Sequence, residues 1–142
     1  MKYREVIHYK YELMEAFTIK VDLPDTPQRS IDEFVFVRDG DLILSKYYAW
    51  DGSTIPMKGL FGIIGWNSDK FCKIASLVHD ALYQLMKAEL LDRKYKDYAD
   101  RFYQFLCKEG GMPDWQANLR YWALKNFGSL KYQDMTPEIF EV

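Results

Sequence analysis

Cysteine and histidine are scarce in this chain of 142 residues, which contains two of each. Cys72 and Cys107 lie far apart in the sequence, and no Cys-x-x-Cys pair is present. A cysteine-rich zinc site is therefore excluded. We expect both cysteines to be buried thiols, because proteins of a reducing cytosol rarely form disulfides.

The chain also lacks an excess of positive charge and a long hydrophobic run. Its 19 Lys and Arg residues and 21 Asp and Glu residues give a net charge of -2. We expect no nucleic-acid partner, since a phosphate backbone is bound by clustered Lys and Arg. The longest uncharged apolar stretch, residues 59–66, is too short to span a bilayer, so no transmembrane segment is expected. The first residues carry charges throughout, which is unlike a signal peptide.

Aromatic residues, by contrast, are abundant. Eleven Tyr, nine Phe and four Trp together make up 17% of the chain. This content indicates either a core built on large rings or an apolar surface that binds a partner.

The first fifty residues predict a small antiparallel sheet. Apolar and polar residues alternate over 16–23, and a second strand is predicted over 31–37. Asp39-Gly40 is a hairpin signal that leads into a third strand over 42–50.

The rest of the chain predicts a loop and three helices. Residues 51–67 are rich in Gly and form the loop, and residues 129–142 form a weakly patterned tail. Apolar residues recur at helical spacing between these segments. The predicted helices cover 69–90, 93–108 and 114–127, with Ile74 and Phe105 among the side chains expected to face the core. The fold class is therefore α+β, a small N-terminal antiparallel sheet followed by a three-helix, bundle-like part, in a single domain over 1–142.

Polar residues at the edge of the first predicted helix are the main candidates for a site. At about 100° per residue, His79, Asp80 and Tyr83 share one edge beside the apolar face. His79 has three interpretations: a structural histidine that satisfies a buried hydrogen bond, a general base or acid oriented by a carboxylate, or a metal ligand.

The loop that precedes this helix offers partners for it. Asp51 follows a strand, and Gly52, Ser53 and Thr54 can present hydroxyl and backbone N–H groups to an anion. The alternative is a plain turn in which Asp51 caps the next N–H groups. We predict a catalytic set of His79, Asp80, Tyr83 and Asp51, and a binding loop of Gly52, Ser53 and Thr54.

Asp100 is the polar residue of the second predicted helix that lies closest to its buried face. A helix hairpin would bring it toward His79. Asp51, His79 and Asp100 together form the predicted metal set, for which the sequence leaves zinc, calcium and manganese open.

The order of these motifs resembles the DUF1353 family of small bacteriophage and prophage proteins. The resemblance covers about residues 30–130 and rests on "WDGSTIP", "ASLVHDALY", "YADRFYQFL" and "ANLRYWALKNFG". Its most specific part is His79-Asp80-x-Leu82-Tyr83. The family usually has Arg where this chain has Lys96. The resemblance implies a viral protein of the host cytoplasm or the virion, with other phage or host proteins as partners.

Two functions from different classes follow. One is a phage hydrolase that acts on a cell-wall peptide, a lipid ester or a phosphodiester. The other is a non-enzymatic phage protein, either a virion or assembly component or an inhibitor of a host defence protein, in which His79-Asp80 has a structural role. The helical His-Asp-x-x-Tyr pattern is also similar to the catalytic helix of phospholipase A2. This similarity is an analogy, because the disulfides of those enzymes are absent from this sequence. The sequence leaves the oligomeric state open.

Overall fold

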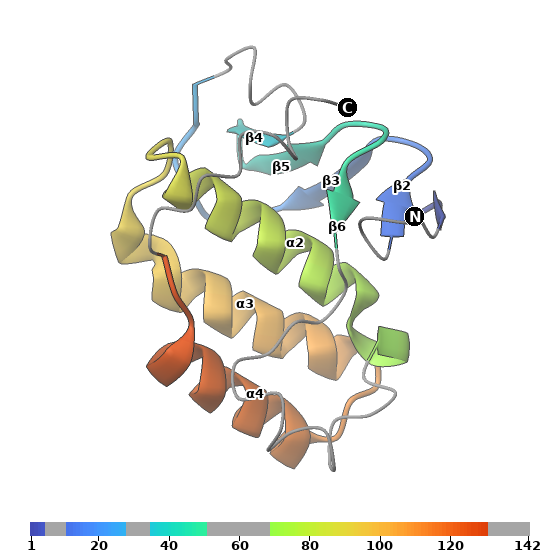
Figure 1. Ribbon diagram of the computed structural model, residues 1–142, viewed down its shortest axis with the longest axis vertical. Helices are drawn as coiled ribbons and strands as arrows, with labels where there is room; N and C mark the ends of the chain where they lie inside the picture. Colours follow the sequence, from blue (N-terminus) through green and yellow to red (C-terminus); the bar gives the residue numbers. More distant parts are fainter. Residues whose placement is uncertain (5–10, 28–34, 51–68, 131–142) are drawn as a thin grey trace.

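A computed structural model describes residues 1–4, 11–27, 35–50 and 69–130 of the chain. These residues form small antiparallel sheets followed by three helices, which confirms the predicted α+β class (Figure 1). No described helix is both long enough and apolar enough to cross a membrane.

Within the described residues, the strands form two three-stranded sheets rather than one. The first sheet has the order β1-β2-β6, with bounds Tyr3–Arg4, Tyr11–Leu13 and Ala49–Trp50. The second has the order β3-β5-β4, with bounds Phe17–Lys20, Asp41–Leu44 and Val35–Arg38. All pairs are antiparallel. The single sheet predicted over the first fifty residues is therefore divided between two.

The hairpin between β4 and β5 confirms the turn predicted at Asp39-Gly40. Asp39 has φ 54° and Gly40 has φ 79°, and Arg38 pairs with Asp41 on either side of them. Two successive residues with positive φ are what a two-residue hairpin loop requires, because such a loop matches the twist of the strands. Asp and Gly tolerate this conformation better than other residues, which is why the local sequence predicts the turn.

Three helices make up the second half of the described chain. They are α2 (Asp69–Lys87), α3 (Lys96–Glu109) and α4 (Asp114–Phe127). A short 3₁₀ turn, Arg93–Tyr95, leads into α3, and the side chain of Asp92 accepts a hydrogen bond from Lys94 N at its start. Asp92 therefore caps this turn.

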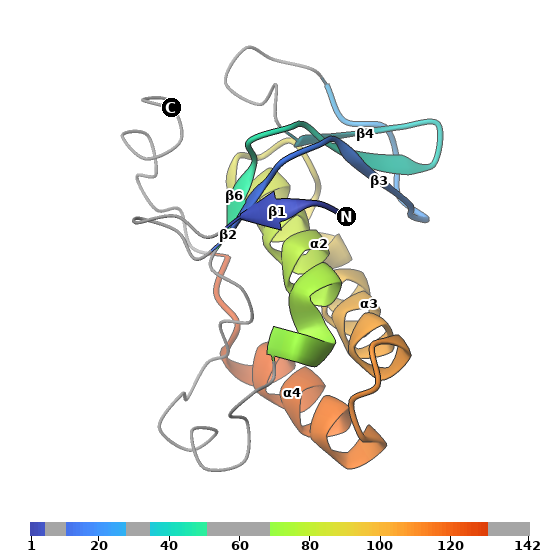
Figure 2. The same cartoon turned by 90° about the vertical axis from the view of Figure 1, so that its right-hand side faces the viewer.

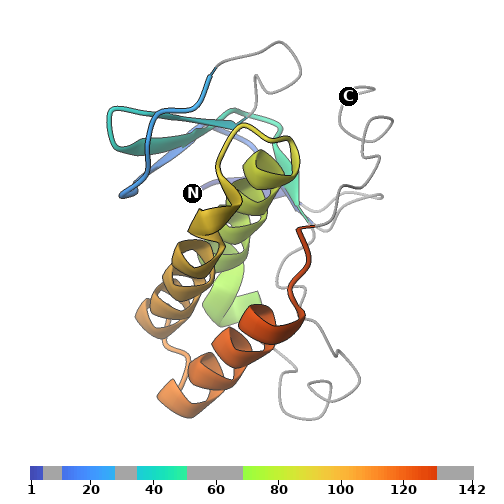
Figure 3. The same ribbon diagram turned by 90° about the vertical axis from the view of Figure 1, so that its left-hand side faces the viewer.

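The helices are stacked in chain order. Figure 1 shows α3 between α2 and α4, with the strands on the far side of α2. The turned views show the strands near one end of this helical layer (Figure 2, Figure 3). Because α2 contacts strands β4 and β6 as well as α3, it is the central element of the fold.

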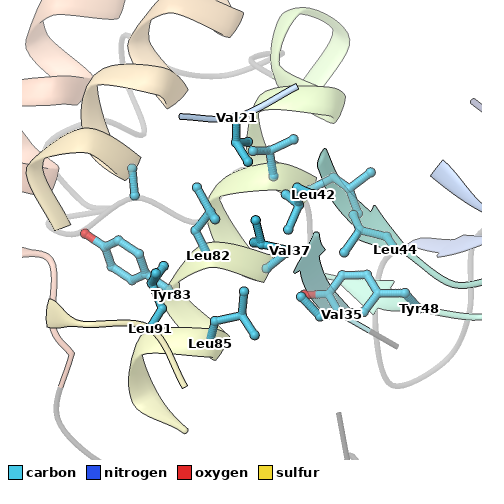
Figure 4. Close-up of a cluster of buried hydrophobic side chains, with 14 of the residues drawn as sticks. Val21, Val35, Val37, Leu42, Leu44, Tyr48, Leu82, Tyr83, Leu85 and Leu91 are labelled. Carbon is cyan, nitrogen blue, oxygen red and sulfur yellow. The ribbon is translucent and has the colours of Figure 1, made fainter. Parts of the chain in front are cut away.

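The buried hydrophobic residues of the described chain form two clusters. One cluster joins the strands to α2 and the start of α3, and Figure 4 shows Leu82 and Leu85 of α2 facing Val35 and Val37 of β4. A second cluster lies between α2, α3 and α4 and includes Cys72 and Cys107. Both cysteines are buried and form no disulfide, as predicted. The side-chain hydrogen bond with Cys72 and, after it, burial raise the pKa of the Cys107 thiol, so it remains protonated.

Two predicted core positions are wrong. Ile74 and Phe105 are exposed rather than buried. Ile74 follows Cys72, whose φ of -122° and ψ of 16° interrupt the helix, so the angular position of Ile74 no longer follows from a regular wheel. Phe105 instead stacks on Phe102 at the surface of α3, with ring centroids 6.3 Å apart.

Candidate functional site

His79 and Tyr83 occupy the same edge of α2, one helical turn apart. Their ring centroids lie 4.0 Å apart, and both residues are buried, with His79 only 5% exposed. The shared edge predicted from the helical wheel is confirmed for this pair. Figure 4 shows the Tyr83 hydroxyl oxygen pointing away from the strands.

Asp100 of α3 faces both of these residues. His79 Nε2 lies 2.8 Å from Asp100 Oδ1, and the Tyr83 hydroxyl donates to the same oxygen at 2.6 Å. Asp100 has no exposed surface, although a buried carboxylate is costly unless it is paired and hydrogen-bonded. The approach of Asp100 to His79 that the predicted helix hairpin implies is confirmed.

Lys96, the first residue of α3, supplies the positive charge. Its Nζ donates to Asp100 Oδ2 at 2.9 Å and to the backbone oxygen of Leu124 at 2.8 Å. The Lys125 oxygen lies 3.5 Å from the same nitrogen. Since Leu124 and Lys125 are in the last turn of α4, this one ammonium group connects the buried carboxylate to the negative end of that helix dipole.

The charges of the cluster follow from these contacts. Burial by itself raises the pKa of Asp100, but hydrogen bonds from His79, Tyr83 and Lys96 hold that pKa below its ordinary value of 3.8. Burial lowers the pKa of His79 from its ordinary 6.5 by more than the contact with Asp100 raises it. Burial, with the bond to Asp100, raises the pKa of Tyr83. At neutral pH the cluster therefore contains a carboxylate, a lysine cation, a neutral imidazole and a protonated phenol.

The tautomer of His79 is fixed by the same argument. An ionised carboxylate can only accept hydrogen bonds, so the contact between Asp100 and His79 requires a proton on Nε2. A neutral imidazole carries one proton, which leaves Nδ1 unprotonated. His79 therefore presents a lone pair at Nδ1 that can accept a proton or bind a cation.

Close packing surrounds this arrangement. The His79 ring also contacts the Tyr103 ring at a centroid distance of 5.2 Å, and Arg120 donates to the Tyr103 hydroxyl at 3.1 Å. A Cβ atom at Gly128 would lie 2.8 Å from the Tyr83 hydroxyl and 2.5 Å from the Leu124 oxygen. Glycine is therefore needed where the chain leaves α4 and passes beside the cluster.

The predicted loop residues Asp51, Gly52, Ser53 and Thr54 lie outside the described residues, and their roles remain predictions. The last described residue before them is Trp50, whose indole nitrogen donates to Ser76 Oγ at 3.1 Å. Ser76 lies three residues before His79 on α2, so this hydrogen bond holds the Trp50 side chain about one helical turn from His79.

Asp80 has a different position from its neighbour His79. It is half-buried, whereas Asp100 is fully buried and accepts hydrogen bonds from His79, Tyr83 and Lys96. The catalytic role of Asp80 remains a prediction.

The described residues contain no group of three or more His, Cys, Asp and Glu side chains able to hold a metal ion. His79 Nε2 and Asp100 Oδ1 lie 2.8 Å apart, which is hydrogen-bond distance. Because Nε2 donates its proton to the carboxylate, this nitrogen has no lone pair to offer a metal. In this geometry Asp100 orients the imidazole, as carboxylates commonly do for metal-bound histidines, and Nδ1 is the nitrogen that can face a metal.

Two residues of the surrounding network are not found by sequence pattern alone. Lys96 and Asp100 are four residues apart, which is the spacing of an ion pair on a helix. The sequence shows this spacing, but the spacing alone does not indicate that the pair is buried. Arg120 is buried and donates a hydrogen bond to Tyr103. No local signal marks Arg120, because its burial results from the packing of α4 on α3.

No protein-family model, curated protein or solved structure matches this chain. The site therefore has to be interpreted from its own geometry, and the resemblance to the DUF1353 family remains a prediction.

Proposed function

We propose that this protein is a small hydrolase of phage origin in which neutral His79 is the general base. The observation that supports this most strongly is the 2.8 Å contact between His79 Nε2 and Asp100 Oδ1. A carboxylate on one imidazole nitrogen fixes the tautomer and stabilises the imidazolium that forms when the other nitrogen takes up a proton. His79 and Asp100 have this relationship, with Nδ1 as the basic nitrogen.

In the proposed reaction, Nδ1 takes a proton from a water molecule as the water oxygen attacks an acyl or phosphoryl centre. The imidazolium that results is stabilised through Nε2 by Asp100, and Nδ1 then returns the proton to the leaving group. General-base catalysis of this kind contributes about 10²–10⁴-fold in rate. The proposed substrates are a cell-wall peptide, a lipid ester or a phosphodiester, since each is cleaved by activated water.

Comparison of wild type with His79→Gln tests this proposal. A glutamine side chain can still donate a hydrogen bond to Asp100, but its amide is not a base. The three substrate classes should be screened with both proteins, in chelator and with added zinc, calcium or manganese. We expect turnover by the wild type, a loss of at least about 100-fold in His79→Gln, and a similar melting temperature for the two. Equal turnover by both proteins, or none by either, would contradict the proposal.

The melting temperature with added metal is a second measurement on the same two proteins. A metal bound at Nδ1 together with the loop carboxylate of Asp51 would stabilise the folded protein by about 2.7 kcal/mol at 100 times its dissociation constant. The increase in melting temperature should be absent in His79→Gln. An increase of equal size in both proteins would place the metal elsewhere.

A second candidate is a non-enzymatic phage protein that binds a protein partner. It is favoured by the complete burial of Asp100 and by the contacts of Lys96 with the end of α4, since both are typical of a cluster that joins helices. Trp115 and Trp122 are exposed on α4 and are of the residue type that dominates binding interfaces. This candidate predicts no turnover of any of the three substrate classes, and full partner binding by His79→Gln.

A further inference from the structure

Lys96 binds acceptors on two helices, at 2.8 and 2.9 Å, with a third at 3.5 Å. Its ammonium group has three protons and lies within 3.5 Å of three oxygens, those of Asp100, Leu124 and Lys125. The side chain is only 23% exposed, so it is not a freely moving surface lysine.

The carboxylate of Asp100 divides its two oxygens between different partners. Oδ1 accepts from His79 and Tyr83 on α2, while Oδ2 accepts from Lys96 on its own helix. Rotation of the carboxylate would break bonds on both sides. Lys96 therefore restricts the direction in which Oδ1 meets the imidazole, and its charge compensates that of the buried carboxylate.

We propose that Lys96 is a positioning residue for His79: by binding Asp100 Oδ2 and the last carbonyls of α4, it holds the carboxylate so that the imidazole keeps its proton on Nε2 and its lone pair on Nδ1. The mechanistic value of this arrangement rests on the proposed hydrolase function. The arrangement itself is measurable without a substrate.

Removal of the ammonium should change the state of the imidazole. In Lys96→Met, Asp100 Oδ2 loses the ammonium group that donates to it, so the carboxylate becomes free to rotate about its side-chain bond. Rotation changes the direction in which Oδ1 meets Nε2. The single neutral tautomer that a base at Nδ1 requires is then no longer held.

Arginine should not substitute fully for Lys96. The three acceptors surround a single nitrogen, which suits a compact ammonium group, whereas guanidinium donates through a planar fork. Lys96→Arg therefore retains the charge but not the contact geometry.

The experiment is a long-range ¹H–¹⁵N correlation spectrum of the histidine rings at pH 7, recorded for wild type, Lys96→Met and Lys94→Met. Lys94 is the matched control, because it lies exposed two residues away and its Nζ is placed over the Tyr95 ring. We expect wild type and Lys94→Met to show His79 with Nε2 protonated and Nδ1 unprotonated. Lys96→Met should show a mixture of the two neutral tautomers. A folded Lys96→Met with the wild-type His79 signals would overturn the inference.

Two further measurements keep the inference testable. If Lys96→Met does not fold, the same spectrum of Lys96→Arg replaces it: displaced His79 signals support the inference, and unchanged signals overturn it. If a substrate is found, Lys96→Met should reduce kcat and leave KM unchanged, and a change in KM alone would contradict a positioning role. The spectra need no substrate, so failure of the hydrolase proposal would leave the positioning role of Lys96 intact. Unchanged spectra together with His79-dependent hydrolysis would overturn the role of Lys96 and leave the hydrolase proposal standing.

Discussion

His79 Nε2 and Asp100 Oδ1 lie 2.8 Å apart although the two residues are 21 positions apart in the chain. One residue is on α2 and the other on α3, so the contact exists only when the two helices pack. The same contact orients the imidazole and satisfies the buried carboxylate. Substitutions at the site therefore affect stability and chemistry together.

Asp100→Asn should strongly destabilise the protein. The variant keeps the shape of the side chain but leaves the Lys96 cation without its counter-ion in a mostly buried position. Breaking a buried pair in this way costs about 3 kcal/mol. Asp97→Asn is the control on the same helix, because Asp97 is paired with Arg101 at the exposed surface and should cost much less. Urea unfolding measures both, and equal losses would contradict the burial of the Asp100 pair.

Tyr83→Phe should reduce the free energy of unfolding by about 2 kcal/mol, since it removes a hydrogen bond to a buried charged group. The lost bond is the 2.6 Å contact with Asp100 Oδ1. Tyr121→Phe removes a hydroxyl that bonds to an exposed carboxylate, that of Asp97, and should have a smaller effect. Thermal unfolding of the two variants compares a buried with an exposed phenol, and an equal decrease would argue against the Tyr83 contact.

Gly128→Ala should cost about 2 kcal/mol, because an added methyl group in a closely packed position forces the structure to move. Its Cβ would be 2.5 Å from the Leu124 oxygen and 2.8 Å from the Tyr83 hydroxyl. The two losses should not add in the double variant with Tyr83→Phe, since removal of the hydroxyl relieves one of the two clashes. Additive losses would show that Gly128 and Tyr83 do not touch.

Acid should destabilise the protein in two stages. The pKa of His79 is lowered by folding, so below pH 6.5 the unfolded chain takes up a proton that the folded protein does not, and stability falls until the pH reaches the folded pKa. The pKa of Asp100 is also lowered, so a second loss begins as the pH falls through 3.8. His79→Gln should abolish the contribution of the first stage. Denaturant unfolding between pH 8 and pH 3 measures both, and an identical pH dependence in the variant would contradict a neutral buried His79.

Local sequence signals predict the helices and the turn of this fold well. The third helix is found at the predicted residues, Asp114–Phe127, and Asp39-Gly40 forms the predicted hairpin turn. These features depend on residues close together in the chain. The division into two sheets depends instead on β6 pairing with β2, far away in the sequence, which no local pattern indicates.

Local sequence signals likewise predict only part of the site. The helical wheel places His79 and Tyr83 on one edge, because helix geometry alone determines that relationship. The wheel cannot distinguish Asp80 from Asp100 as the partner of His79, since only the packing of α3 brings Asp100 into contact. The contact of Lys96 with the carbonyls of α4 also requires the packing of a third helix, so no local sequence pattern predicts it.

Whether His79 is a neutral base with its proton on Nε2 can be read from the ¹⁵N spectrum of the wild-type imidazole rings at pH 7. The chain has two histidines, so the signals that disappear in His79→Gln assign the site. We expect an unprotonated Nδ1 and a protonated Nε2 for His79. A doubly protonated ring, or a proton on Nδ1, would contradict it and leave the cluster as a structural connection between α2, α3 and α4.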